Sequence, residues 1–165
     1  MPFILALIAA AVGAYFWMNR ARNAANVAGD LADMATDVIG AARRFGFRRR
    51  ANIHPVDSID DPDLAAGALA YAFMELGSLP SQEQQQALAA SLGRHLGRTL
   101  SQAEEMLILG RWLTTECGGP QSAVLRLARR LYKLAGAERL DSTMAILNDV
   151  AKSGHGGNLS DRQRD

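Results

Sequence analysis

The sequence has few of the residues and motifs that stabilise secreted proteins or carry catalysis. Its single cysteine, Cys117, cannot form an internal disulfide, which excludes a disulfide-stapled fold and fits a reducing compartment. It has no glycine-rich phosphate loop, no Cys and His set at metal-ligand spacing and no nucleophile elbow. No segment shows the strict alternation of a half-buried strand. These absences predict an all-α protein that is not an enzyme and holds no cofactor or metal.

Charge is nearly balanced overall but unevenly distributed along the chain. The 165 residues include 18 Lys and Arg against 17 Asp and Glu. Seven arginines and only three aspartates lie between Trp17 and Arg50, whereas twelve acids and nine bases lie between Asp57 and Lys152. This asymmetry predicts a basic collar ahead of a mildly acidic domain. The length suits one domain plus an anchor.

Residues 2–18 form a run of 17 apolar residues, near the lower limit of the roughly 17 to 25 that a transmembrane helix needs. We predict a membrane anchor over residues 1–19, with Trp17 at the membrane interface. No basic residue precedes the run, so the pattern differs from that of a signal peptide. Because Arg20 and Arg22 follow the run, the positive-inside rule predicts a single pass through the bacterial inner membrane, with an outer N-terminus and a cytoplasmic domain.

Two stripes of residues extend the anchor prediction. Small residues at four-residue spacing suit packing against another membrane protein subunit or a second copy, although an alanine-rich composition accounts for them equally well. A short heptad stripe predicts an amphipathic stalk helix over residues 20–42, which suits a coiled coil, the headgroup layer or a partner. The stripes are Ala6, Ala9, Ala10, Gly13 and Ala14 in the anchor and Val27, Leu31, Met34 and Val38 in the stalk.

Helical periodicity is lost over residues 43–61, which predicts a flexible basic linker. Phe45 and Phe47 stand among five arginines, and we expect them to reach acidic lipid headgroups, where each base contributes on the order of 1 kcal/mol. The composition also suits nucleic acid. The tethered position and the acidic domain beyond favour membrane lipid, and no nucleic-acid partner is predicted.

The remaining sequence predicts five helices within residues 62–154 and a disordered polar tail over residues 155–165. Glycine, proline and capping residues mark where the helices begin and end. The predicted boundaries are Asp61 as N-cap with Pro62 and Gly77 for the first helix, Pro80 and Gly97 for the second, a capping box of Ser101 and Glu104 with a stop at Gly118 for the third, Pro120 and Gly136 for the fourth, and Gly154 as the end of the fifth.

Several segments within residues 63–152 and just beyond carry a resemblance to a known family. They are Leu64–Gly77 followed by Pro80–Gly97, then Leu131–Gly136 and Leu147–Gly154. The order of these helices resembles the TerB-like fold of tellurite-resistance proteins, which implies a compact five-helix bundle. An apolar span ahead of such a domain is also similar to the layout of DjlA-type cochaperones without their J domain.

The resemblance bears on metal binding as well. Some TerB-like proteins bind divalent metal through acidic residues that follow an Asp-Gly turn. The matching turns here are residues 75–77 (Glu-Leu-Gly) and 152–154 (Lys-Ser-Gly), which both lack the aspartate. Hard cations need several convergent oxygen ligands, so Glu75 with Glu83 is too small a set and no metal site is predicted.

Few residues are candidates for a functional site. Cys117 is expected at a helix C-terminus, where the dipole disfavours a thiolate, and His95 is expected to cap the end of the second helix. A continuous basic face on the fourth helix suits solvent, an acidic partner or the membrane surface. Its residues are Arg126, Arg129, Arg130 and Lys133.

The combined features predict a membrane-anchored, non-catalytic interaction or scaffold protein. Its helical domain is expected to recruit an unidentified cytoplasmic protein, and an accessory subunit of a larger membrane complex is the specific version of this hypothesis. The alternative, which follows the family resemblance, is a metal-responsive stress sensor.

Overall fold

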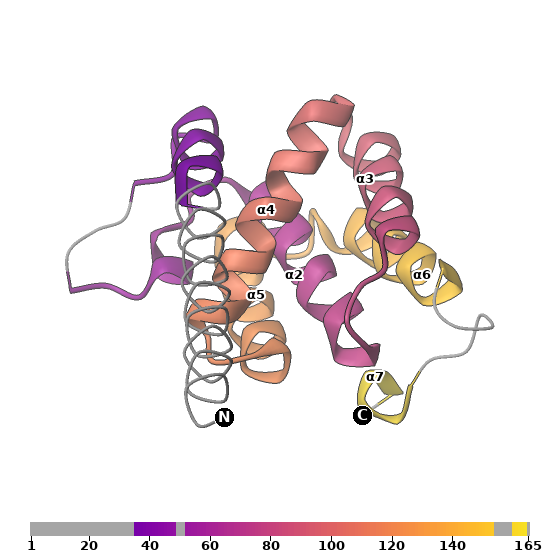
Figure 1. Cartoon of the computed structure of the whole chain (residues 1–165). Coiled ribbons are helices and arrows are strands. Elements are labelled where there is room, and N and C mark those ends of the chain that lie inside the picture. The colour runs from indigo at the N-terminus through magenta and orange to yellow at the C-terminus, as the bar shows by residue number, and fades with distance from the viewer. Residues whose placement is uncertain (1–34, 49–51, 154–159, 165) are drawn as a thin grey trace, which may run out of the picture. The chain divides into compact units, whose positions relative to one another are not determined.

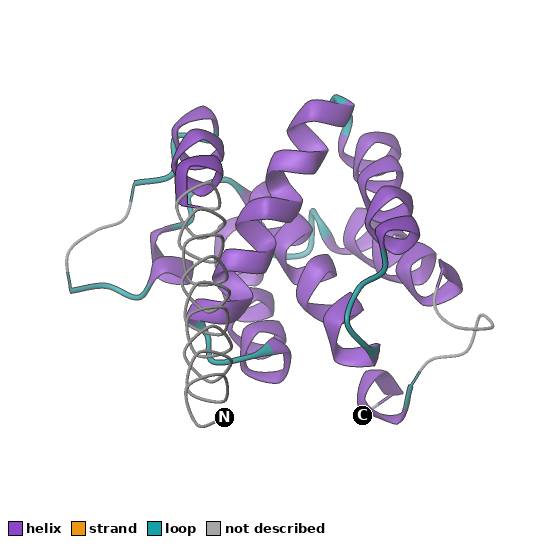
Figure 2. Cartoon of the chain, in the orientation of Figure 1, coloured by secondary structure: helices purple, strands orange, loops and turns teal. Residues whose placement is uncertain are grey.

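The computed structural model describes residues 35–48, 52–153 and 160–164, and every regular element in these ranges is a helix (Figures 1 and 2). The predicted all-α class is therefore confirmed for this part of the chain. Within the same ranges, none of the helices combines the length and the apolar character that crossing a bilayer requires. The chain divides into two units, Met1–Asp37 and Val38–Asp165, and the description below concerns the second.

The predicted anchor and most of the predicted stalk lie outside the described residues. A helix at residues 35–44 covers the end of the predicted stalk and includes one of its stripe residues, Val38, which packs half-buried against the core. The predictions for the other residues of the two stripes and for the membrane interface stay predictions. Those residues are Ala6, Ala9, Ala10, Gly13, Ala14, Trp17, Arg20, Arg22, Val27, Leu31 and Met34.

One helix, α2, lies at the centre of the domain and contacts α3, α4, α5, α6 and α7 (Figure 1). As predicted, Asp61 is its N-cap, with Oδ1 accepting a hydrogen bond of 2.8 Å from the backbone N–H of Asp63. Twelve of the sixteen residues of α2 are buried, as expected for a helix that is apolar on all sides. The elements are η1 (Pro55–Ser58), α2 (Pro62–Gly77), α3 (Gln82–Leu96), α4 (Leu100–Glu116), α5 (Pro120–Ala135), α6 (Leu140–Ser153) and α7 (Asp161–Arg164).

Close packing between α2 and α4 depends on a glycine. A Cβ atom at Gly110 would lie 2.9 Å from Cβ of Tyr71 and 3.3 Å from Cα of Ala68. One is a backbone atom of α2 and the other is a Cβ atom bonded directly to that backbone, so neither can move aside without shifting the helix. Gly110 therefore sets how closely α4 approaches the centre of the core.

Both α3 and α4 begin with a capping box, but the second box differs from the prediction. In α3, Ser81 Oγ accepts from the Gln84 N–H, and Gln84 Oε1 accepts from the Ser81 N–H at 2.9 Å. In α4 the same exchange joins Thr99 and Gln102, two residues before the predicted box. The predicted pair of Ser101 and Glu104 was wrong because two capping patterns overlap here and the earlier one begins the helix.

The ends of α5 and α6 follow the predicted signals. Gly119, with φ of 127°, precedes Pro120, and this backbone conformation is one that L side chains rarely adopt. α5 ends at Ala135 before Gly136, and α6 ends at Ser153, the residue before the predicted stop. α5 packs on α2, and α6 packs on α3.

The described part of the predicted linker is packed onto the bundle. Val56 in η1 and Ile59 directly after it are fully buried. His54 is the N-cap of η1, and its Nδ1 accepts from the N–H of Val56 at 3.3 Å. This order was missed because a single 3₁₀ turn is too short to produce a detectable hydrophobic period.

The predicted disordered tail also contains an ordered element. α7 (Asp161–Arg164) follows Ser160, whose N–H donates to Oε1 of Gln163 at 3.1 Å. The Nε2 of Gln163 donates to the carbonyl of Phe73 in α2 at 3.0 Å, so this short helix is attached to the domain. Disorder was predicted from the polar composition. The helix was missed because none of its residues is buried, so it has no apolar stripe to detect.

Candidate functional site

The predicted basic face of α5 forms one wall of a groove with a volume of about 770 Å³. We call this hollow the α5 groove. All four predicted docking residues line it, together with residues from η1, from the segment before η1 and from the end of α4. The lining residues are Ile53, Asp57, Cys117, Ser122, Leu125, Arg126, Arg129, Arg130 and Lys133.

Two of the four predicted docking residues are bound within the domain. Arg126 Nη2 donates to Oδ2 of Asp57 at 2.6 Å, and this hydrogen bond lowers the pKa of Asp57 from its ordinary value. Arg130 donates from Nε to the carbonyl of Ile59 at 2.7 Å and also pairs with Asp60 at 3.2 Å. The Arg130 side chain is only 11% exposed, so the prediction of a basic face open to solvent or a partner was wrong for this residue.

The other two docking residues, Arg129 and Lys133, remain available. Both are exposed, and neither side chain has a hydrogen bond or an acidic partner among the described residues. Because they are four residues apart, they lie on the same side of α5. Leu125 is a further four residues earlier and is 58% exposed. The outward row of the α5 groove is therefore one apolar residue followed by two free cations.

Cys117 lies at the α4 end of the groove as the C-cap of that helix, which agrees with its predicted place at a helix end. Its side chain is half-buried. Burial raises the pKa of the thiol above its ordinary value of 9.0, so the thiol is protonated at neutral pH. A nucleophilic role is disfavoured by this environment.

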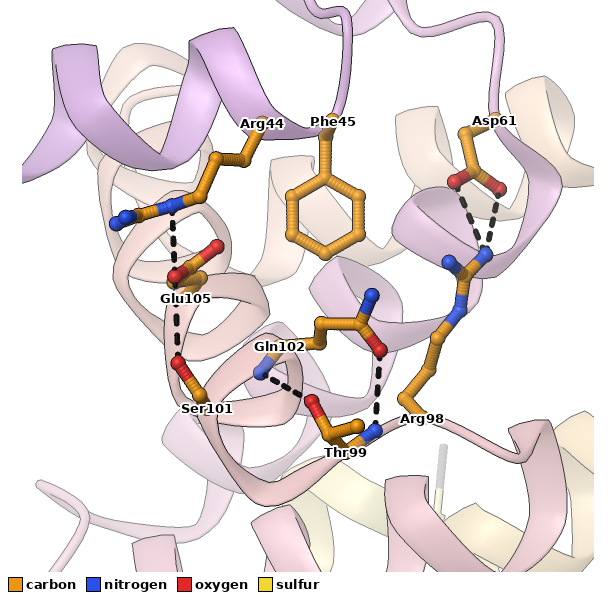
Figure 3. Close-up of a pocket in the computed structure, with 8 residues that line it drawn as sticks. All are labelled: Arg44, Phe45, Asp61, Arg98, Thr99, Ser101, Gln102 and Glu105. Carbon is orange, nitrogen blue, oxygen red and sulfur yellow. Dashed lines mark hydrogen bonds and ion pairs between the residues drawn. The ribbon is translucent and has the colours of Figure 1, made fainter.

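A second, smaller hollow of about 460 Å³ lies where residues 44–45 meet the start of α4 (Figure 3). Arg44 Nε lies 2.7 Å from Oε1 of Glu105. On the other side, Arg98 Nη2 lies 3.1 Å from Oδ2 of Asp61, and the Arg98 guanidinium lies 5.7 Å from the ring centre of Phe45. Figure 3 shows the Phe45 ring pointing into the space between these two ion pairs.

Beside this hollow, the charges of Asp61 and Asp63 balance those of Arg98 and Arg139. Asp63 is 5% exposed and receives a 2.7 Å hydrogen bond from Arg98 Nη2. Arg139 Nη2 is 3.0 Å from the other oxygen of Asp63, but it is not aligned for a hydrogen bond. The side chains thus neutralise each other and join the ends of α2, α3 and α4, which indicates a structural role.

Phe45 and Phe47 belong to residues 41–48, which contact α4 and form what we call the joint. Both pack half-buried against the core, and the Phe47 ring makes an edge-to-face contact with Trp112 at 5.8 Å between centroids. Ala41, one helical turn earlier, is fully buried. The expectation that these phenylalanines reach lipid headgroups therefore does not agree with the structure, because their apolar surface is covered by the bundle.

His95 has a different partner from the one predicted. Its Nε2 lies 3.1 Å from Oδ2 of Asp149 in α6, where it had been expected to cap its own helix. Ser91 Oγ donates to the same oxygen at 2.7 Å, and Arg94 Nη2 lies 3.0 Å from it. The hydrogen bond from Ser91 is the main cause of the lowered pKa of Asp149. The sequence did not reveal this cluster because Asp149 is more than fifty residues away from the three residues of α3 that it contacts.

The described residues include no group of three or more His, Cys, Asp and Glu side chains placed to hold a metal ion. Glu75 is half-buried near the end of α2 and Glu83 is exposed in α3. Comparison of the chain with known protein families, curated proteins and solved structures finds no match. The TerB-like resemblance therefore stays a prediction.

Proposed function

We propose that this chain is a membrane-anchored, non-catalytic adaptor that recruits a protein partner through the α5 groove. The observation that carries the proposal is the row of Leu125, Arg129 and Lys133 on the outer wall of the groove. Exposed apolar surface beside unpaired charge is typical of an interaction surface, whereas internal ion pairs account for the neighbouring cations. An accessory subunit of a larger membrane complex is the specific form of this function.

The environment of the potentially reactive groups also supports a non-catalytic function. His95 is bound to Asp149, and His54 caps η1 while its Nε2 lies 3.3 Å from the carbonyl of Glu116. The Cys117 thiol is protonated. Each of these groups therefore has a structural partner or an environment that opposes nucleophilic chemistry.

The joint between residues 41–48 and α4 suits an adaptor as well. Ala41, Phe45 and Phe47 contribute to the core or pack against it, and Arg44 pairs with Glu105. The bundle is thereby held directly against the segment that follows the predicted stalk. A packed joint limits the volume that the α5 groove can search and raises its effective concentration near membrane partners.

The anchor part of the proposal is tested by membrane extraction of the full chain expressed in a bacterium. We expect the wild-type chain to stay in the membrane pellet after alkaline carbonate treatment. The double variant Ile8→Lys/Val12→Lys is expected to enter the supernatant, because each lysine at mid-span costs about 2.5–3.5 kcal/mol. Recovery of the wild-type chain in the supernatant would refute the anchor.

The recruitment part is tested by purifying the tagged chain in mild detergent after in-cell crosslinking. A crosslinked partner is expected with the wild-type chain and not with Arg129→Glu/Lys133→Glu. The matched control is Arg111→Glu/Lys152→Glu, which changes the net charge equally at two other exposed positions. Equal recovery of the partner with both double variants would exclude the α5 groove as the recruiting surface.

A further inference from the structure

We propose that the α5 groove binds an acidic amphipathic helix of the partner. This inference rests on the proposed function and specifies the chemistry of the partner at the same surface. Two carboxylates four residues apart on the bound helix pair with Arg129 and Lys133. An apolar side chain beside the carboxylates covers Leu125 and Ile53, which are 58% and 43% exposed.

The spacing of the free groups matches a helix. Leu125, Arg129 and Lys133 follow one another at four-residue steps, so the row extends about 12 Å along α5 at 1.5 Å per residue. A second helix laid along the groove repeats its own side chains at the same interval. Each side chain at four-residue spacing on the partner helix can therefore contact one residue of the row on α5, as in other helix-in-groove complexes.

The groove is formed before the partner arrives. Asp57 and the carbonyl of Ile59 hold Arg126 and Arg130 against the segment that contains η1. These internal bonds hold the η1 segment against α5, and the buried side chains of Val56 and Ile59 anchor that segment to the core. A preformed groove loses little conformational freedom on binding, so a short helix can gain useful affinity from a few contacts.

An anionic membrane surface fits the groove less well. Of the four cations that line the groove, Arg129 and Lys133 are the two without an acidic partner among the described residues, whereas lipid-binding clusters use about four to eight basic residues. Asp57 and Asp60 pair with Arg126 and Arg130, so these two cations are already neutralised and add little attraction for headgroups. A concave site with two cations and exposed apolar residues favours a protein helix with matching carboxylates.

The test measures fluorescence anisotropy with the full chain in a non-ionic detergent. The probe is a labelled helical peptide of 18 residues, with glutamates at four-residue steps beside a stripe of leucines. We expect saturable binding that weakens as salt increases. A second peptide, in which each glutamate is replaced by glutamine, is expected to bind at least tenfold more weakly.

Variants of the chain show whether the peptide occupies the groove. Arg129→Glu/Lys133→Glu is expected to weaken binding of the acidic peptide at least tenfold, while Arg111→Glu/Lys152→Glu leaves it within twofold. Leu125→Ala should weaken binding without changing its dependence on salt. Circular dichroism confirms that each variant is folded. Absence of saturable binding by the wild-type chain, or equal binding of the two peptides, would overturn the inference.

Two other occupants give recognisable results. Vesicles of anionic phospholipid that bind the wild-type chain but not Arg129→Glu/Lys133→Glu would assign the groove to lipid. Self-association that the same variant abolishes would assign it to a second copy of the chain. Either result overturns the peptide-binding inference. The proposed function fails separately, through loss from the membrane pellet or through partner recovery that is unaffected by Arg129→Glu/Lys133→Glu.

Discussion

The Nε atom of Arg44 lies 2.7 Å from Oε1 of Glu105, which joins the end of helix 35–44 to α4. The two side chains differ in environment, since that of Arg44 is 67% exposed and that of Glu105 only 9%. A buried carboxylate depends on its partner because burial disfavours the charged form. The other carboxylate oxygen of Glu105, Oε2, is buried and has no hydrogen bond among the described residues. Arg44 therefore stabilises both Glu105 and the docked position of residues 41–48.

Replacing Arg44 with alanine is expected to loosen this joint. We expect Arg44→Ala to lower the free energy of unfolding by about 1 kcal/mol, since exposure of the arginine screens part of the attraction. Amide hydrogen exchange over residues 41–48 should become faster than in the wild-type chain. The control is Arg43→Ala, because Arg43 is exposed and its side chain makes no ion pair with the described residues. Equal exchange in both variants would show that the ion pair does not hold the joint.

The capping box of α4 makes a second prediction. Thr99 Oγ1 accepts the N–H of Gln102, so Thr99→Ala should lower the free energy of unfolding by about 1 kcal/mol. Ser101→Ala should change it by less than about 0.5 kcal/mol, because this exposed residue lies inside the first turn. Thermal unfolding followed by circular dichroism compares the two variants. A larger loss with Ser101→Ala would place the N-cap where the sequence had suggested it.

The difference between the observed N-cap, Thr99, and the predicted one, Ser101, shows which helix ends can be predicted from the sequence. Helix ends marked by a proline, a glycine or an N-cap were located from sequence because those signals act over a few residues, as at Asp61, Pro120 and Gly136. The choice between two overlapping capping patterns at Thr99 and Ser101 was not local. Either pattern could start the same helix, and the structure has the earlier one, at Thr99.

Interactions between distant residues explain the remaining differences. The basic face of α5 was found from its spacing, and all four residues do line one groove. The sequence did not show that Arg126 and Arg130 form hydrogen bonds with Asp57 and Ile59, because these partners are about seventy residues apart. Periodicity identifies which residues share a helix face, but only packing decides which of them remain free.

Asp149 provides a prediction about pH. Its pKa lies below the ordinary 3.8, mainly because of the hydrogen bond from Ser91. A carboxyl group whose pKa is lower in the folded state stabilises the fold above its unfolded pKa, and this contribution is lost as pH falls through the folded pKa. We expect Asp149→Asn to cost about 1–2 kcal/mol at pH 7, with a smaller difference from wild type below about pH 4.

Chemical denaturation at several pH values checks this prediction for Asp149. Glu138→Gln is the matched control, since it makes the same carboxylate-to-amide change at an exposed position after α5. The control should differ little from the wild-type chain at any pH. A constant cost of Asp149→Asn from pH 7 to pH 3 would show that shape, not charge, accounts for the role of this residue.

Arg129 and Arg130 are neighbours in sequence but should respond oppositely to mutation. Arg130→Ala leaves the carbonyl of Ile59 without its donor, so we expect a loss of about 1–3 kcal/mol in the free energy of unfolding. Arg129→Ala should leave stability within about 0.5 kcal/mol of wild type, because its side chain is exposed. Binding of the acidic peptide should show the reverse dependence at a temperature where both variants are folded. If Arg129→Ala destabilised the fold as much as Arg130→Ala, the separation of the α5 cations into a structural pair and a free pair would be wrong.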